Sequence, residues 1–380
     1  MDPAAAVAGM DELVEEVLLR SPPDDPAHLA RAALVCRRWC RILTGPGFRR
    51  RFREHHRSPP MLGCFHRPFL NVPDSGAPCG FAPTASFRLR NAGLGGRYAL
   101  DSRHGRVLVG VLPSVGGAPE ARLAVWDPVT GEQLELPEPP LEREGPLLSW
   151  NAAVLCASSR DGACDHLDCS RGQFLVVVVV TTILSLFAYV YSSEDGEWSQ
   201  RACVLEFFVC FDHSEPSVLA GNALCFISAN QIDSGSRIIK YDLGTSRIYV
   251  IGLPPRTSQC RRSAMLTATE NGGLGCAIVE NSRLCLWSMA VGPDEHTVWT
   301  QSRVIELQKI NSDNSVLISY YLAGFTHGLN ILFAMRLDGL FSIDLKSGRM
   351  KKAREREGKG IYNVIPYVSF CTPGTSLLSS

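Results

Sequence analysis

The pattern of apolar and polar positions divides the chain into two parts with different periods. Before residue 58, apolar residues recur at spacings of three and four. From about residue 84, short apolar runs alternate with clusters of Gly, Asn, Asp and Pro. The first pattern is typical of amphipathic helices and the second of strands joined by tight turns. The sequence therefore predicts a small all-α N-terminal module followed by a large all-β domain.

Turn and capping residues divide the N-terminal part into helices. Asp11 is a residue type that caps helix N-termini, and Pro22-Pro23 ends the helix that follows it. Asp24-Asp25-Pro26 then starts a second helix, which Gly45-Pro46 separates from a short third one. Residues 1–10 are mostly small, and we expect them to form a disordered tail.

The predicted module, residues 11–57, is too small to be stable on its own core. At about 45 residues it falls in the size range where a single apolar core contributes little, and its apolar positions cover more than one face. We expect it to bury the remaining apolar surface against the rest of the chain or against a partner.

A motif runs through these helices. Its residues are Leu13…Val17-Leu18…Pro22-Pro23…Leu29…Leu34-Val35-Cys36-Arg37-Arg38-Trp39…Leu43…Pro46…Phe48. This pattern resembles the F-box, and LVCRRW (34–39) is its strongest element. The following RRRFREHHRSPPMLGCF (49–65) is similar to the segment after the F-box in grass F-box proteins. The usual opening Leu-Pro is absent, because Gly9-Met10 precedes Asp11.

The resemblance implies a partner. F-box helices bind a Skp-type adaptor, which links the chain to a cullin scaffold. By this resemblance the adaptor-binding surface is formed by Leu13, Val17, Leu18, Pro22, Leu34, Val35, Cys36 and Trp39. An alternative is that Leu34, Cys36 and Trp39 are core residues that join the helices to the β-domain.

A two-strand unit repeats in the β-rich part. It occurs at residues 121–137, 236–254 and 339–353, each time with an Asp after the first strand (Asp127, Asp242 and Asp344), and with a longer loop at 282–299. Such a carboxylate accepts hydrogen bonds from turn N–H groups, and Gly131 and Gly348 allow positive φ nearby. At roughly 45 residues per blade, the repeats predict a β-propeller of about six irregular blades.

The ends of this domain follow from the same pattern. The final strand, 362–370, is apolar enough to close the ring beside an early strand. We assign residues 58–83 to a linker, 84–372 to the propeller-like domain and 373–380 to a tail. Several stretches, including CDHLDC (164–169), are similar to the domain that accompanies the F-box in grass proteins.

One apolar run has two interpretations. Residues 174–191 (FLVVVVVTTILSLFAYVY) contain no charge and approach the length of a membrane-spanning helix. Val, Ile, Thr, Phe and Tyr dominate the run and favour strands. We predict two buried strands with a turn near Thr181-Thr182, and the alternative is a membrane-anchored protein.

Composition limits the class of protein. The formal net charge is +0, which argues against a nucleic-acid-binding chain. The 14 cysteines lie mostly within apolar runs, as thiols do in a reducing compartment. The N-terminus does not resemble a secretory signal. These features predict a protein of the cytoplasm or nucleus with no membrane or nucleic-acid partner.

No catalytic or cofactor motif stands out. Cys164, Asp165, His166 and Cys169, with Cys156 nearby, are residue types found at zinc sites, but their spacing lacks paired CxxC or HxxxH units. The glycine-rich stretches 93–96 and 271–275 do not form a phosphate-binding loop. We therefore predict no metal, no cofactor and no enzymatic activity.

Together these features predict a substrate-recognition subunit of an SCF-type E3 ubiquitin ligase, in which the β-domain binds an unknown target protein. The alternative is an interaction scaffold with a degenerate F-box. Five loops (112–120, 138–149, 192–200, 254–263 and 292–299) differ too much for the target-binding face to be predicted.

Overall fold

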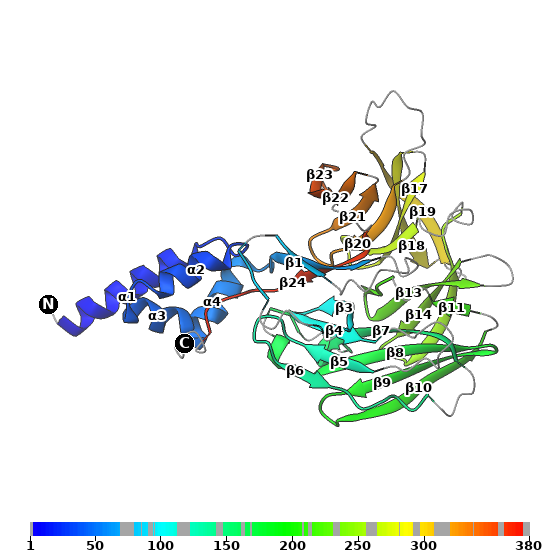
Figure 1. The fold of residues 1–380 in the computed structure, drawn as a ribbon, viewed down its shortest axis with the longest axis horizontal. Helices are drawn as coiled ribbons and strands as arrows, with labels where there is room; N and C mark the ends of the chain where they lie inside the picture. The colour runs from blue at the N-terminus through cyan, green and yellow to red at the C-terminus, as the bar shows by residue number, and fades with distance from the viewer. Residues whose placement is uncertain are drawn as a thin grey trace.

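The computed structural model places a helical module at one side of a large β-domain, from which it projects (Figure 1). It describes the whole chain except residues 1–2, 69–79, 85, 90–93, 95, 112–121, 142–146, 161–163, 168, 207–208, 212–214, 231–235, 256–263, 281, 292–296, 308–319, 337, 356–360 and 375–380. Within the described residues, the predicted architecture of an α-helical module followed by a β-propeller is confirmed.

The described part of the module contains four helices: α1 (Pro3–Leu19), α2 (Pro26–Ala33), α3 (Arg37–Thr44) and α4 (Pro46–His56). Because α1 begins at Pro3, Asp11 lies inside it, and both its predicted capping role and the predicted tail over 1–10 are wrong. The segment 3–8 is mostly alanine, the best helix former. The predicted second helix is also interrupted, since Cys36 is extended and separates α2 from α3.

The helices enclose a small apolar centre, the module core. Its fully buried members include Leu18, Leu29, Leu43, Phe48 and Phe52. Phe370, which follows the last strand of the β-domain, belongs to the same cluster, and its ring centroid lies 6.1 Å from that of Phe52. The module therefore completes its core partly with the rest of the chain.

The described strands form six sheets, one for each blade of a propeller. Blade 1 along the chain contains β3 (Tyr98–Arg103), β4 (Arg106–Gly110), β5 (Leu123–Trp126) and β6 (Gln133–Glu135), and blade 2 contains β7 (Leu147–Cys156), β8 (Phe174–Thr182), β9 (Ser185–Ser192) and β10 (Glu197–Leu205). Blade 3 contains β11 (Val209–Phe211), β12 (Val218–Ala220), β13 (Ala223–Asn230), β14 (Ser236–Asp242) and β15 (Arg247–Gly252). Blade 4 contains β16 (Ala264–Ala268), β17 (Leu274–Glu280), β18 (Arg283–Val291) and β19 (Thr297–Glu306), and blade 5 contains β20 (Tyr321–Phe325), β21 (Ile331–Arg336), β22 (Gly339–Asp344) and β23 (Met350–Glu355). The predicted number of blades is confirmed.

The sixth blade combines both ends of the β-domain. β24 (Ile361–Val368) pairs antiparallel with β1 (Met61–Pro68), which pairs with β2 (Gly80–Pro83). This confirms that the final strand closes the ring. It also shows that the linker prediction for 58–83 is wrong, because both early strands belong to the propeller. The sequence pattern did not indicate β1 because it contains Gly63 and Pro68, and these residue types usually mark turns.

The uncharged run 174–191 forms the antiparallel strands β8 and β9, as predicted. Every residue of β8 is buried. The turn lacks Gly, Asn and Asp, but Thr182 Oγ1 accepts hydrogen bonds from the backbone N–H groups of Leu184 (3.3 Å) and Ser185 (3.0 Å). A threonine hydroxyl thus performs the task of an Asx side chain. Among the described helices, none has the length and apolarity needed to cross a bilayer.

Neighbouring blades are joined by two tryptophans on outer strands. Trp198 Nε1 on β10 donates to the carbonyl of Pro137 (2.7 Å), and Trp299 Nε1 on β19 donates to the carbonyl of Gly252 (2.9 Å). In both cases the acceptor lies at the end of the preceding blade. The two tryptophans therefore have equivalent places in the propeller.

The three repeated aspartates fix their turns as predicted. Asp127 Oδ1 accepts the N–H groups of Val129 and Thr130, and Asp242 and Asp344 accept equivalent pairs two and three residues on. Four residues after each Asp the backbone has positive φ: Gly131 at 82°, Ser246 at 54° and Gly348 at 71°. Only the middle repeat places a side chain in this conformation, which costs an L-residue about 1–2 kcal/mol.

The turn geometry predicts opposite effects of two substitutions. Gly131→Ala should lower the free energy of unfolding by about 1 kcal/mol or more, because alanine is strained at positive φ. Ser246→Gly relieves that strain in the equivalent turn and should not lower it. Urea denaturation of the full chain measures both, and an equal loss in the two variants would contradict this account of the turns.

Candidate adaptor-binding surface and central cavity

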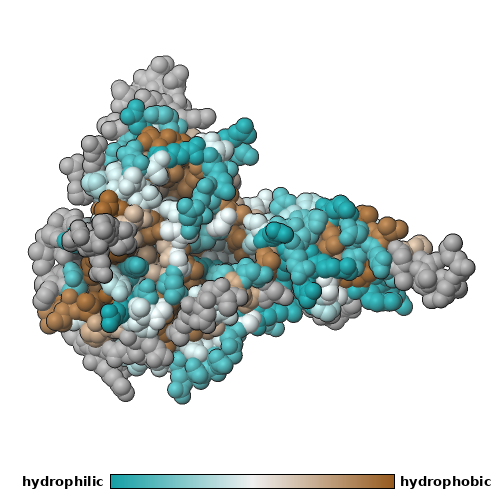
Figure 2. Space-filling model, turned by 180° about the vertical axis from the view of Figure 1, so that it is seen from behind, coloured by the Kyte–Doolittle hydropathy of each residue, from teal (hydrophilic) through white to brown (hydrophobic). Residues whose placement is uncertain are grey.

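Among the described side chains of the helical module, five large apolar ones are exposed. We call them the distal ridge: Met10, Leu13, Val17, Leu34 and Val35. Leu13 is 69% exposed and Leu34 is 83% exposed. Figure 2 shows apolar surface on the projecting module, toward the end farthest from the propeller. Single exposed apolar residues are ordinary, but a contiguous apolar group of this kind marks an interaction site.

Two elements form the ridge. Met10, Leu13 and Val17 follow the i, i+3, i+7 spacing of one face of α1. Leu34 and Val35 lie in the turn between α2 and α3. An ion pair between Arg38, at the start of α3, and Asp11 of α1 holds this turn beside the part of α1 that carries the ridge.

The structure sorts the predicted adaptor-binding residues. Exposed side chains are Leu13, Val17, Pro22, Leu34, Val35 and Cys36, whereas Trp39 is half-buried against the module core. Leu18 is only 3% exposed and belongs to that core, so its own side chain does not lie on the exposed surface. The reason is helical geometry: α1 is apolar on two faces, and Leu18 lies on the inner one with Val14.

The structure divides the residues of the alternative interpretation of the LVCRRW segment. Leu34 and Cys36 are exposed, whereas Trp39 packs against the module core, a cluster that also contains Phe370 of the β-domain. Met10 was missed because residues 1–10 were expected to be a tail. Its spacing from Leu13 and Val17 was the signal that could have revealed it.

The module is fixed to the propeller at its other end. Ser86, which precedes β3, donates a hydrogen bond to the Asp25 carboxylate and accepts one from the N–H of Ala27 (3.0 Å). The hydrogen bond from Ser86 lowers the pKa of Asp25. The Ser86 hydroxyl of the β-domain therefore links the Asp25 carboxylate to the N–H of Ala27 at the start of α2. Leu167, in the connection between β7 and β8, also packs against the module core.

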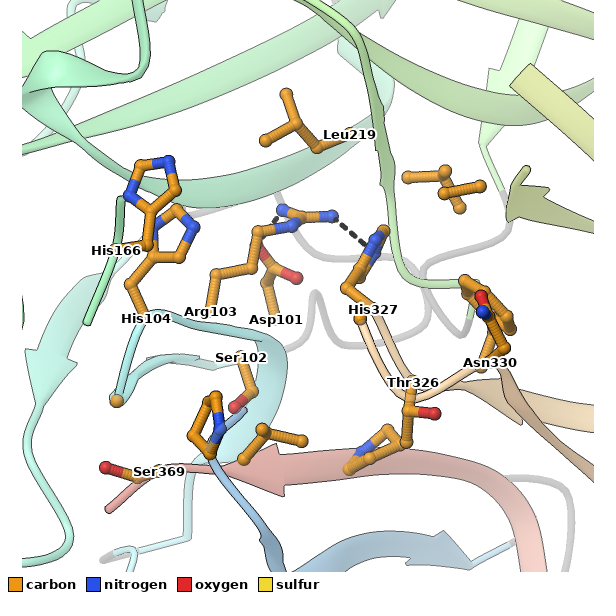
Figure 3. Close-up of a pocket in the computed structure, with 18 of the residues that line it drawn as sticks. Asp101, Ser102, Arg103, His104, His166, Leu219, Thr326, His327, Asn330 and Ser369 are labelled. Carbon is orange, nitrogen blue, oxygen red and sulfur yellow. Dashed lines mark hydrogen bonds and ion pairs between the residues drawn. The ribbon is translucent and has the colours of Figure 1, made fainter. Parts of the chain in front are cut away.

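A cavity of about 540 Å³ lies where the blades and the module meet. The labelled side chains in Figure 3 come from several blades and point into it. Asp101 and Arg103 on β3 form a buried ion pair at its wall, with 2.5 Å between Oδ2 and Nη1.

This buried pair connects four blades. Asp101 Oδ2 accepts the N–H of Val154 on β7 (2.9 Å). Arg103 Nη2 donates to Ser217 Oγ before β12 (2.9 Å), and lies 3.3 Å from His327 Nε2 after β20 (Figure 3). Burial, with a smaller effect from Arg103, lowers the pKa of His327 to about 3. Its ring is therefore neutral at pH 7 and its Nε2 accepts this bond. We interpret the pair as a structural hub.

The hub predicts a large difference between two charge-neutralising substitutions. Asp101→Asn leaves the Arg103 charge buried and uncompensated, which should lower the free energy of unfolding by about 3 kcal/mol or more. Glu306→Gln breaks the exposed Arg283–Glu306 pair and should change it by at most about 1 kcal/mol. Chemical denaturation compares the two. Similar small losses would show that the hub does not hold the blades.

The structure also brings together four of the cysteine and histidine side chains between residues 156 and 169. The ligand atoms of Cys156, Cys164, His166 and Cys169 all lie within 4.8 Å of one another. We call this group the cysteine cluster. Linear spacing gave no paired metal-binding unit, but the fold brings the end of β7 against the following connection. Burial is the main cause of a raised pKa at the Cys169 thiol, so it does not resemble an activated nucleophile.

Comparison with known proteins agrees with these two parts of the molecule. An F-box domain model matches residues 11–51, and the model "F-box protein AT5G49610-like, beta-propeller" matches residues 98–373. The fold and the sequence together define an F-box module joined to a six-bladed β-propeller. The chain belongs to the F-box protein AT5G49610-like beta-propeller family. Its similarity to grass proteins in particular remains a prediction.

Solved structures resemble the chain only distantly. The WD40 domain of SCAP from fission yeast has a TM-score of 0.36 and 13% identity, over 70% of this chain and 55% of that one. TolB from Acinetobacter baumannii has a TM-score of 0.41 and 12% identity, over 84% and 69%. No curated protein matches the chain. These similarities carry no inference about function.

Proposed function

We propose that the chain is the substrate-recognition subunit of an SCF-type ubiquitin ligase. In this proposal the helical module binds a Skp-type adaptor through the distal ridge, and the propeller binds a target protein. The observation that carries the proposal is the exposure of the ridge on a module whose other end is fixed to the propeller.

The ridge has the character of an interface centre. Burying one large aliphatic side chain contributes about 1.5–3 kcal/mol, so several ridge residues supply enough free energy for specific binding. Exposed charged residues, including Glu12, Glu16 and Arg37, neighbour the ridge in sequence. An apolar centre with a charged rim is the usual anatomy of a protein–protein interface.

Met10 bears on the alternative of a degenerate F-box. The usual opening Leu-Pro is missing, but α1 extends back to Pro3, and Met10 is exposed on the same face as Leu13. We infer that Met10 supplies an apolar contact at the end of the ridge where the usual motif would begin. This supports adaptor binding over a scaffold that has lost it.

The proposed receptor needs no chemistry of its own. It would hold a target near a ubiquitin-conjugating enzyme and raise the effective concentration of the reacting groups. A cytoplasmic or nuclear site of action, where SCF ligases work, belongs to the same proposal. The cullin scaffold would be reached through the adaptor.

Titration with a purified Skp-type adaptor tests the proposal. The double variant Leu13→Asp/Val35→Asp places two charges in the ridge and should weaken binding at least about 100-fold, since each tenfold step corresponds to about 1.4 kcal/mol. The matched control is Leu205→Asp/Val298→Asp. Leu205 is 72% exposed on the propeller, close to the exposure of Leu13.

The control variant should bind the adaptor as the unmodified chain does. Equal binding by the ridge variant would move the interface elsewhere. A folded, unmodified chain that binds no adaptor would favour the interaction scaffold instead.

A further inference from the structure

We propose that the cysteine cluster holds a structural zinc ion, which fixes the connection on which the helical module rests. The ligands would be the thiolates of Cys156, Cys164 and Cys169 and Nδ1 of His166. Three cysteines and one histidine form a complete ligand set for a closed tetrahedral zinc site with no open coordination position.

The distances fit such a site. With Zn–S near 2.3 Å and Zn–N near 2.0 Å, a tetrahedron has edges of about 3.8 Å between sulfurs and about 3.5 Å between sulfur and nitrogen. Cys169 Sγ lies 3.6 Å from His166 Nδ1, and all four ligand atoms lie within 4.8 Å of one another. The side chains therefore need only small adjustments to enclose the ion.

Surrounding groups hold the ligands in place. The N–H of His166 donates to Cys164 Sγ (3.3 Å), a bond that orients the sulfur. The His166 ring stacks on that of His104, with 3.9 Å between centroids and 5° between planes (Figure 3). His104 Nδ1 in turn accepts the N–H of Cys156 (3.2 Å). Outer contacts of this kind fix ligand orientation at metal sites.

Charge and softness favour zinc. Thiolate and imidazole ligands in a tetrahedral arrangement select zinc over the hard cations Mg²⁺ and Ca²⁺. Three thiolates and Zn²⁺ together carry one negative charge. The guanidinium groups of Arg53 and Arg106 lie close enough to Cys169 to interact with it electrostatically, and they would offset that charge.

The position of the cluster gives the ion a structural consequence. Cys156 is the last residue of β7, and Cys169 begins a short 3₁₀ helix, Cys169–Arg171. Leu167, between two ligands, packs against the module core. Tying this connection to the end of β7 would fix the helical module relative to the propeller. The zinc site is inferred independently of the proposed function. Only its importance for the geometry of a ubiquitin ligase rests on that function.

Metal analysis of the untagged full chain, expressed with zinc supplied, tests the proposal. Inductively coupled plasma mass spectrometry should find one zinc per chain. The variants Cys164→Ser and His166→Ala should contain much less than one zinc per chain. The control variant Cys203→Ser, at an exposed cysteine on β10, should keep its zinc. Replacement of zinc by Co²⁺ should give the thiolate charge-transfer and visible bands of a tetrahedral site.

The test does not depend on whether the ligand variants fold. Chelation of the unmodified chain, followed by Co²⁺ titration, reports the site directly. Zinc removal should also speed proteolysis between Cys156 and Phe174. A folded, unmodified chain without stoichiometric zinc, or thiol counting that reveals a disulfide in the cluster, would overturn the site. Unchanged proteolysis after metal removal would overturn its role at the junction. Adaptor titration is a separate measurement, so this proposal and the proposed function can fail independently.

Discussion

The antiparallel pairing of β1 with β24 is the interaction on which the rest of the molecule depends. It closes the ring by placing strands from both ends of the β-domain in one blade. It also brings the chain entering the propeller from α4 beside the chain leaving it. Phe370, two residues after the end of β24, belongs to the module core, so closing the ring and packing the helices are parts of the same arrangement.

In this arrangement, some apolar side chains of the helices pack into the module core and others remain exposed. A module of this size cannot bury all of its apolar residues within itself. Phe52 and Leu18 pack inward, and Phe370 completes their cluster from the propeller. Leu13 and Leu34 face solvent at the far end. The module is therefore held at one end by the propeller and leaves apolar side chains exposed at the other.

Polar contacts as well as apolar ones hold the helical module and the blades in place. Ser86 relays the cap of α2, the Asp101–Arg103 pair joins blades around the cavity, and the cysteine cluster lies at the end of β7. Each places its groups where several chain segments converge. Hydrogen bonds fix relative orientation more strictly than apolar packing, because they are directional.

The sequence by itself determined what depends on neighbours along the chain. Period and turn chemistry were enough to predict the helical module, the aspartate turns at Asp127 and its repeats, and the strands of 174–191, because these follow from local sterics and hydrogen bonding. Only the tertiary structure decided what depends on distant contacts. It placed β1 in the closing blade, turned Leu18 inward, and gathered Cys156 with His166, since spacing along a chain does not state which segments meet in space.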